Sequence, residues 1–141
     1  MIAQKSKAPL NLMEQVVMIL IFAFAAALCV QAFVLADTMS KEAYARDKAA
    51  MISQTMAETV KSQHGDMEKA AVLLGEMAEA TQEGLFMFYD SAWEATDKAS
   101  AKYIICMEVK EADDYISKGE INVLAAEEEE IIFTLPVSWQ N

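Results

Sequence analysis

The feature that most constrains this chain is a long uncharged run near its N-terminus. Residues 15–36, QVVMILIFAFAAALCVQAFVLA, contain no Asp, Glu, Lys or Arg, and every residue from Val16 to Val30 is apolar. A helix rises about 1.5 Å per residue, so roughly 20 apolar residues cross a hydrocarbon core about 30 Å thick. The run therefore predicts one transmembrane helix over residues 15–36.

Charge is distributed unevenly around this run. The chain holds 22 acidic residues and 11 Lys and Arg, for a net charge of -11. Lys5 and Lys7 lie in the leader, residues 1–14, whereas every acidic residue except Glu14 follows the run. Basic residues are retained on the cytoplasmic side of a membrane helix. We therefore expect a cytoplasmic N-terminus and an extracytoplasmic C-terminal domain. The acidic domain also argues against direct nucleic-acid binding, because it repels phosphates.

A cleavable signal peptide is the alternative interpretation of the same run. Lys5 and Lys7 would form its basic region, and Val34-Leu35-Ala36 before Asp37 is an acceptable cleavage site. The run is longer than the roughly 7–15 apolar residues of a signal peptide. No Gly or Pro lies between Leu10 and Gly65 to interrupt a helix. A retained helix is favoured, and cleavage after Ala36 stays open.

Helical periodicity continues beyond the apolar run. Apolar or small residues recur at gaps mostly of three and four, which is typical of one helix face: Met39, Ala43, Ala45, Ala49, Ile52, Met56 and Val60. We predict that residues 37–63 continue the helix, giving one helix over about 11–62, roughly 75 Å long. The alternative is two helices with a loop near Asp37.

The end of this helix is predicted from its turn residues. Gly65 is a C-terminal signal and Asp66 an N-cap. A second, short helix of three or four turns should follow, with Met67, Ala71, Leu74 and Ala78 on its apolar face.

Beyond Gly84 the apolar period becomes two. Alternating residues predict strands near 85–89, 103–110, 121–125 and 131–139, separated by short turns. Short connections favour an antiparallel meander of three or four strands. Pro136 cannot donate to a ladder, so the last strand should be an edge. The stripe Ile52, Met56 and Val60 is the nearest apolar surface to cover such a sheet. Residues 64–141 are thus expected to form the extracytoplasmic domain.

The composition leaves little material for catalysis. With one His and two Cys, and without HExxH, CxxC or a glycine-rich phosphate loop, we expect no enzyme, no catalytic residue, no metal site and no cofactor. Cys29 and Cys106 are expected to be small buried hydrophobic residues, and His64 a surface residue. Trp93 and Trp139 are expected in the core or at the sheet edge, and Glu127–Glu130 in a solvated turn.

The N-terminal sequence resembles a known family. LNLMEQVVMILIFAFAAALCVQAF is similar to the N-terminal segment of type IV pilins and type II secretion pseudopilins, which have a basic leader, an aliphatic-x-aliphatic-aliphatic-Glu opening and a long apolar stretch. Leu10, Leu12, Met13 and Glu14 match that opening. VLADTMSKEAYARDKAAMISQTMAETVK resembles the outer half of the helix in minor pseudopilins. The sequence pattern of the family is matched over residues 5–62. The expected sheet resembles the family in its architecture only.

The resemblance implies an α+β fold, in which a long N-terminal helix packs on a small antiparallel sheet. The helix has a transmembrane half and an amphipathic outer half. It implies a single-pass protein of the bacterial cell membrane, whose partners are membrane lipid and other pilin-like subunits bound through the N-terminal helix. Processing would occur between Pro9 and Leu10, and Glu14 would pair with a neighbouring subunit's N-terminal amine.

One residue departs from the family pattern. The peptidase of the family cuts after Gly, whereas this chain has Pro9. If the leader stays on, the new amine that pairs with Glu14 does not form. The protein would then remain in the bilayer as a pilin-like membrane protein.

Small residues in the apolar run suggest how copies associate. Helices in lipid pack closely where side chains are small, and polar side chains add hydrogen bonds. We therefore predict helix–helix packing through Ala23, Ala26, Ala27 and Gln31. The first functional hypothesis is a non-catalytic structural subunit of a pilus, secretion or DNA-uptake assembly. The alternative is a secreted or membrane-anchored binding module.

Overall fold

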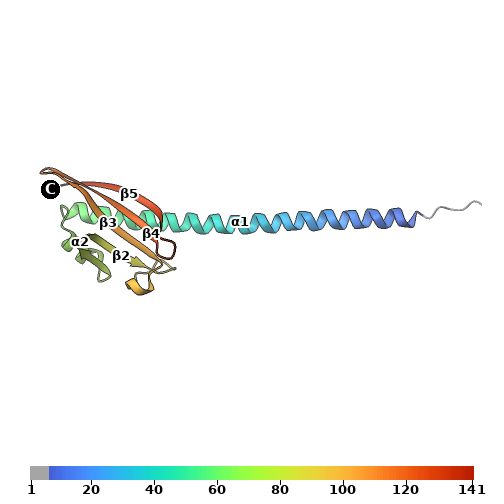
Figure 1. Ribbon diagram of the computed structural model, residues 1–141, viewed down its shortest axis with the longest axis horizontal. Helices are drawn as coiled ribbons and strands as arrows, with labels where there is room; N and C mark the ends of the chain where they lie inside the picture. The colour runs from blue at the N-terminus through green and yellow to red at the C-terminus, as the bar shows by residue number, and fades with distance from the viewer. Residues whose placement is uncertain (1–6) are drawn as a thin grey trace, which may run out of the picture. The chain divides into compact units, whose positions relative to one another are not determined.

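The computed structural model describes residues 7–141. The chain divides into two compact units, residues 1–43 and 44–141. One helix, α1 (Ala8–Ser62), supplies the described part of the first unit and the first element of the second (Figure 1). The predicted single helix is therefore confirmed and begins three residues earlier than expected. No loop interrupts it near Asp37. Lys5 lies outside the described residues.

Local chemistry explains why α1 runs unbroken. Pro9 lies in the first turn, where its missing N–H removes no helical hydrogen bond. Near Asp37, where the sequence allowed a loop, Lys41 Nζ lies 2.7 Å from Asp37 Oδ2, and the two residues are one helical turn apart. Thr38 Oγ1 donates to the carbonyl of Val34 at 3.0 Å, so this hydroxyl is satisfied within the helix.

α1 ends where the predicted turn residues Gly65 and Asp66 begin the connection to the next helix. Gly65 has φ 83° and its N–H donates to the carbonyl of Val60 at 3.0 Å, closing the last turn. A Cβ at this position would overlap the indole of Trp139. Asp66 caps α2 (Met67–Leu74), because its Oδ1 accepts the N–H of Lys69 at 3.0 Å. Both predicted signals are confirmed.

The predicted length of the second helix is wrong. α2 ends at Leu74, and Ala78 begins a strand instead of completing the apolar face. Gly75 adopts φ 117°, outside the helical region, and its N–H caps the carbonyl of Ala71. The glycine therefore ends α2 after two turns.

The sheet has five antiparallel strands in the sequential order β1-β2-β3-β4-β5. Their bounds are β1 (Ala78–Thr81), β2 (Gly84–Tyr89), β3 (Tyr103–Ala112), β4 (Ile116–Ala125) and β5 (Glu130–Gln140), and a short 3-10 turn spans Lys98–Ser100. The meander is as predicted, but the expected three or four strands omit β1. Its sequence, AEAT, has little strand propensity, and pairing with β2 holds it in place.

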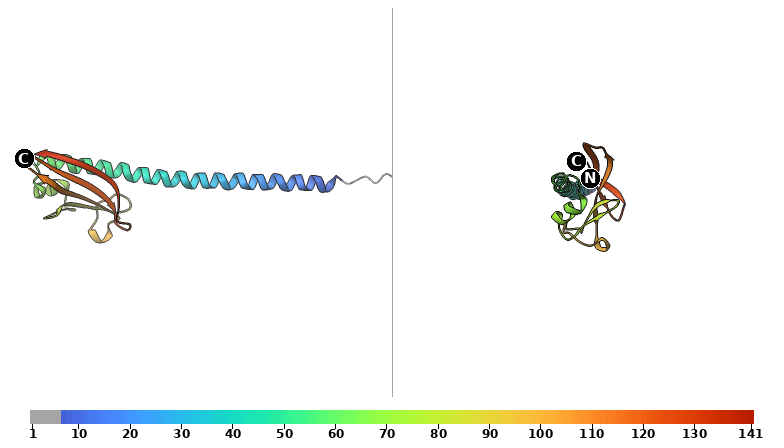
Figure 2. Two further views of the ribbon diagram at one scale, coloured as in Figure 1. Left: turned by 45° about the horizontal axis from the view of Figure 1, so that its top comes forward. Right: turned by 90° about the vertical axis from the view of Figure 1, so that its left-hand side faces the viewer.

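Within residues 44–141, α1 covers one face of the sheet (Figure 2). Met56 and Val60 are fully buried against the inward residues of the sheet, which are Leu85, Met87, Ile105, Met107, Ile121 and Val123. Ile52 packs partly against this core. The predicted stripe therefore does cover the sheet, and hydrophobic burial is the main force joining the layers.

β5 is an edge strand, as Pro136 predicted. Pro136 lies opposite Glu120 and has no N–H to offer a further strand. The opposite edge, β1, is only four residues long. Short edges and an edge proline both discourage strand addition from another chain.

The two tryptophans are core residues, as expected. Trp93 stacks on Tyr103 with ring centroids 4.1 Å apart, and Trp139 is buried below Gly65. Trp93 has φ 61°, an uncommon conformation for a bulky residue. Asp90 holds this turn, because its Oδ1 accepts the N–H groups of Ala92 and Glu94 at 2.8 and 3.0 Å.

Candidate functional site

The predicted processing residues all lie in the first two turns of α1. Leu10 and Glu14 are four residues apart and therefore share one helix face. Both are exposed, and no ion pair to Glu14 occurs within residues 7–141. The helical placement of Pro9 means that a peptidase would meet this segment inside a helical turn.

The predicted packing residues lie together on one face of α1. Ala23, Ala27 and Gln31 follow each other at intervals of four, and Ala26 borders them, so the four form one strip. Glu14 is nine residues before Ala23, or two and a half turns, and therefore points away from this strip. The helix brings the small residues together but separates them from the acid.

Every residue from 7 to 43 is exposed. The most apolar 18-residue window of α1 has a mean hydropathy of 2.6, and protein buries none of it. α1 is long and apolar enough to cross a membrane, by length and composition. Apolar surface costs about 25 cal/mol for each Å² left in water, so this segment requires lipid or protein around it.

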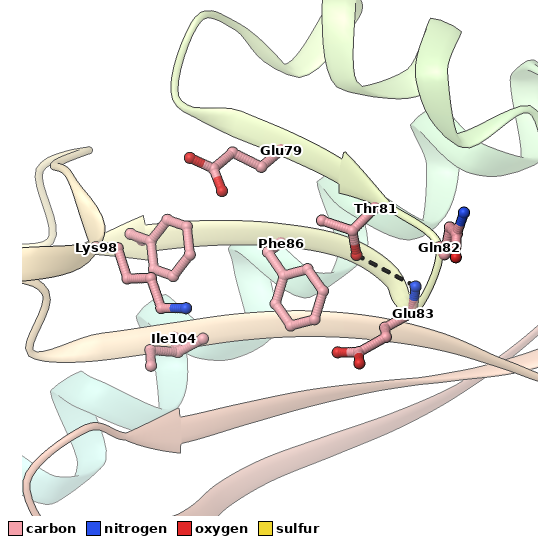
Figure 3. Close-up of a pocket in the computed structure, with 8 residues that line it drawn as sticks. Glu79, Thr81, Gln82, Glu83, Phe86, Lys98 and Ile104 are labelled. Carbon is pink, nitrogen blue, oxygen red and sulfur yellow. Dashed lines mark hydrogen bonds between the residues drawn. The ribbon is translucent and has the colours of Figure 1, made fainter.

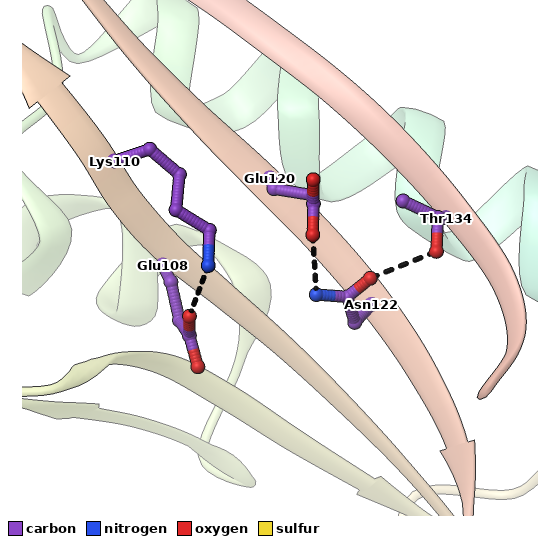
Figure 4. A network of polar contacts seen from close by, with 5 residues as sticks. All are labelled: Glu108, Lys110, Glu120, Asn122 and Thr134. Atoms are coloured by element: carbon purple, nitrogen blue, oxygen red, sulfur yellow. Dashed lines mark hydrogen bonds and ion pairs between the residues drawn. The ribbon is translucent and has the colours of Figure 1, made fainter. Parts of the chain in front are cut away.

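The outer face of the sheet carries a polar network (Figure 4). Glu108 and Glu120 lie directly opposite each other on β3 and β4, an unfavourable pairing of like charges. Lys110 Nζ lies 2.8 Å from Glu108 Oε2, and Asn122 Nδ2 donates to Glu120 Oε1 at 2.9 Å. Thr134 Oγ1 donates to Asn122 Oδ1 at 2.8 Å. Each carboxylate therefore has a donor on its own strand, and the bond between Thr134 and Asn122 joins β5 to β4.

The same face has an apolar groove of about 430 Å³, which we call the Phe86 groove (Figure 3). It is lined by Glu79, Thr81, Gln82, Glu83, Phe86, Phe88, Lys98 and Ile104. In Figure 3, Phe86 lies centrally, with Lys98 and Ile104 toward one end and Glu83 toward the other. Phe88 is almost fully buried, whereas Phe86 remains partly exposed.

The Phe86 groove was not among the predicted sites. Its signal in the sequence is LFMFY, in which apolar residues occupy both alternating registers of β2. Such a strand has cover on both faces. The segment after β2 returns beside Phe88, since the N–H of Thr96 donates to the carbonyl of Phe88 at 3.0 Å. Nothing in the local pattern indicates that the cover stops short of Phe86.

The remaining candidate residues form no reactive cluster in the described chain. Burial raises the pKa of the Cys106 thiol, as suits a core residue, and Cys29 lies exposed on α1. His64 is exposed, with Nδ1 3.4 Å from the carbonyl oxygen of Gln140. Among residues 7–141, no three His, Cys, Asp or Glu side chains lie close enough together to hold a metal ion.

Glu127, Glu128 and Glu129 lie in a solvated turn, as expected, whereas Glu130 is the first residue of β5. Residues 126–129 connect β4 to β5 and are largely exposed. Lys102 Nζ lies 2.8 Å from Glu127 Oε1, and this hydrogen bond lowers the pKa of Glu127 and raises the pKa of Lys102.

No known protein family, curated protein or solved structure matches this chain significantly. The observed α+β arrangement, one long N-terminal helix packed on an antiparallel sheet, is consistent with the pilin-like fold.

Proposed function

We propose that this protein is a non-catalytic, pilin-like subunit, similar to a minor pseudopilin, of a pilus, type II secretion or DNA-uptake assembly. The observation that carries the proposal is the continuity of α1. Its apolar N-terminal part has no protein cover, and its C-terminal part is built into the sheet domain. A helix of this kind connects lateral association in the bilayer to a folded domain outside it.

The chemistry of the uncovered part of α1 supports association between helices. Ala23, Ala26 and Ala27 permit close approach of two backbones, and Gln31 offers a hydrogen bond beside them. Glu14 supports a specific partner, because a charged residue carried to the centre of a membrane helix costs about 2.5–3.5 kcal/mol. An N-terminal amine of a neighbouring copy is such a partner.

The distribution of charge supports the orientation. The N-terminus lies in the cytoplasm of a bacterial cell, and residues 44–141 lie outside, because the bases precede the apolar run and the acids follow it. The blunt edges of the sheet also favour assembly through helices rather than by strand addition.

The direct test is the intact mass and N-terminal sequence of the protein recovered from its native membrane. We expect an N-terminus at Leu10, carried by a protein that resists extraction with high salt. A Glu14→Gln variant should be processed normally but lose cross-links between copies, with Glu42→Gln as the exposed control on the same helix. An N-terminus at Asp37 would contradict the proposal. A protein that still begins at Met1 would be compatible with a membrane anchor but would contradict the role of a filament subunit.

A second candidate is an extracytoplasmic binding module, anchored or secreted. The Phe86 groove favours it, since Phe86 offers aromatic surface beside the carboxylates of Glu79 and Glu83. Two findings together would establish this candidate in place of the first. The mature protein would begin at Asp37, and the soluble domain would bind a ligand in the Phe86 groove.

A further inference from the structure

Arg46 is the only arginine of the chain, and it has no ion-pair partner among residues 7–141. It is exposed on α1, shortly after the apolar run ends at Ala36. All 22 acidic residues of the chain lie in the part that the structure describes, yet none of them engages this guanidinium group. In so acidic a chain, an unpaired arginine keeps its donors for an anion from outside the protein.

Two acidic residues lie close to Arg46 along the helix, and neither is paired with it. Glu42 is one turn earlier, at the spacing that suits an ion pair, but none forms in the structure. Asp47 is the next residue and lies about 100° further around the helix. Lys41 differs, because its Nζ lies 2.7 Å from Asp37 Oδ2 at the same spacing of one turn.

An exposed aromatic ring lies beside Arg46 in the same stretch of α1. Tyr44 is 54% exposed, and the Nζ of Lys48 lies 5.5 Å from the centre of its ring. Residues 44–48 therefore combine one tyrosine and two bases within about one and a half helical turns. Tyrosine together with Lys and Arg is typical of a membrane–water interface, where rings are half-buried and the cations lie among the head groups.

The direction of α1 brings these side chains toward the proposed bilayer. Side chains of an α-helix lean toward its N-terminus, and the N-terminal part of α1 is the part proposed to span the membrane. The lean is visible at two bases, since Lys41 reaches Asp37 and Lys48 reaches the ring of Tyr44, each one turn earlier. The Cα of Arg46 lies about 15 Å beyond the apolar run along the axis. Head groups extend roughly 5–8 Å beyond the hydrocarbon core, so a guanidinium that leans back over one turn approaches them.

We propose that Arg46 binds the phosphate groups of anionic lipids in the outer leaflet, with Tyr44 and Lys48 at the same interface. A guanidinium group is planar, and its paired N–H donors match two oxygens of one phosphate. The contact fixes the depth of α1, because the acidic remainder of the chain is repelled by an anionic surface. This inference rests on the proposed function, in which the apolar part of α1 spans the bilayer, and it adds the lipid group that the helix recognises.

The test uses the single arginine as a reporter. The full chain, made with isotopically labelled arginine, is placed in vesicles of equal parts phosphatidylcholine and phosphatidylglycerol, in a buffer without phosphate. Every arginine signal then comes from position 46. In solid-state NMR we expect the Cζ signal to lose intensity through dipolar coupling to lipid phosphorus, since the contact brings the two atoms together. An arginine signal without this coupling would overturn the proposal.

A matched control moves the reporter along the same helix. In a variant with Arg46→Gln and Lys61→Arg, the only arginine lies about 22 Å further along α1, at another exposed position. Its signal should show no coupling to lipid phosphorus. Coupling of equal strength at position 61 would mean that any exposed base meets the vesicle surface, and it would overturn the contact assigned to Arg46.

The same signal distinguishes two other partners of Arg46. Glu42→Gln should leave the coupling to lipid phosphorus unchanged. Coupling that appears only when Glu42 is replaced would make Glu42 the partner of Arg46, against the proposal. Inorganic phosphate, added to the full chain in dodecyl maltoside micelles, should not shift the arginine signal. A shift there, without coupling in vesicles, would assign Arg46 to a free anion and overturn the lipid contact.

The effect on depth is measured at Met39, a residue 61% exposed just beyond the apolar run. With Cys29→Ala and Cys106→Ala removing the native thiols, Met39→Cys reports access of a membrane-impermeant maleimide. Adding Arg46→Gln should raise the labelling rate by up to about fivefold, the factor by which one base near an anionic surface changes binding. Lys61→Gln is the control and should leave the rate unchanged. The same rate with and without Arg46 would contradict its role in fixing the depth.

Extraction with high salt separates failure of this inference from failure of the proposed function. A chain that stays in the vesicles but shows an uncoupled arginine contradicts the lipid contact alone and leaves the subunit proposal standing. A chain that leaves the vesicles in high salt contradicts both, because neither holds without α1 in the bilayer.

Discussion

The two parts of α1 show how one helix is adapted to two surroundings. In residues 15–36 apolar side chains occupy every face and remain exposed. In residues 44–62 only one face is buried, through Ala49, Ser53, Met56, Ala57 and Val60. Uniform apolarity suits lipid, which surrounds a helix on all sides, whereas a single stripe suits a sheet, which covers one side. The backbone is helical in both parts, so the difference in the surroundings that suit them comes from their side chains alone.

The largest expected effect comes from replacing one methionine in each part of α1. Met56→Ala removes a fully buried side chain and should lower the free energy of unfolding by about 2–5 kcal/mol, because a cavity is left. Met18→Ala, on the exposed part, should leave the unfolding of the domain unchanged. Urea denaturation of the full chain in detergent, followed by tryptophan fluorescence, measures both. Equal losses in the two variants would contradict the comparison.

A smaller effect is expected at Ser53, in the buried stripe. Its Oγ is fully buried and has no hydrogen-bond partner. Ser53→Ala should therefore raise the free energy of unfolding by about 1 kcal/mol, since an unpaired buried hydroxyl is removed. Ser62→Ala, whose exposed Oγ donates to the carbonyl of Thr59 at 2.7 Å, is the control and should not stabilise. A destabilised Ser53→Ala variant would show that this hydroxyl has a role in the core.

The reactivity of the two cysteines distinguishes protection by lipid from protection by protein. If the apolar part of α1 spans the bilayer, as we propose, a membrane-impermeant maleimide applied to vesicles should label neither Cys29 in that part nor Cys106, which is buried and has a raised pKa. Urea should expose Cys106 and leave Cys29 unlabelled. Labelling of Cys29 in intact vesicles would place the first part of α1 in water.

The smallest effect concerns the cap that follows α1. The hydrogen bond with Lys69 lowers the pKa of Asp66 below its usual value of 3.8. A depressed pKa means that the ionised cap stabilises the fold above pH 3.8, and this stabilisation is lost as the pH falls through the lowered pKa. Acid titration of Asp66→Asn should therefore show a shallower loss of stability below about pH 4 than the parent chain. Identical acid profiles would show that the cap does not contribute.

Much of the fold follows from short-range patterns. The end of α1 before Gly65, the start of α2 after Asp66 and the edge position of the strand that holds Pro136 all follow from local signals of dihedral freedom, capping and missing donors. β1 was missed because AEAT has little strand propensity, although it pairs with β2 across a two-residue turn. The early end of α2 was missed because Gly75 leaves the helical region, which an apolar spacing does not reveal. The Phe86 groove was missed for a related reason. Its floor is apolar like any core strand, and the sequence alone does not reveal that Phe86 stays partly exposed while Phe88 is buried.

The central claim is that α1 is one uninterrupted helix passing from lipid to the sheet domain. Hydrogen–deuterium exchange of the full chain in lipid vesicles tests it most directly, at the amides of residues 37–43 that join the two parts. We predict that these amides exchange more slowly than in an unfolded peptide, since each is bonded within a continuous helix. Exchange at the unfolded rate there, or a chain that begins at Asp37, would contradict it.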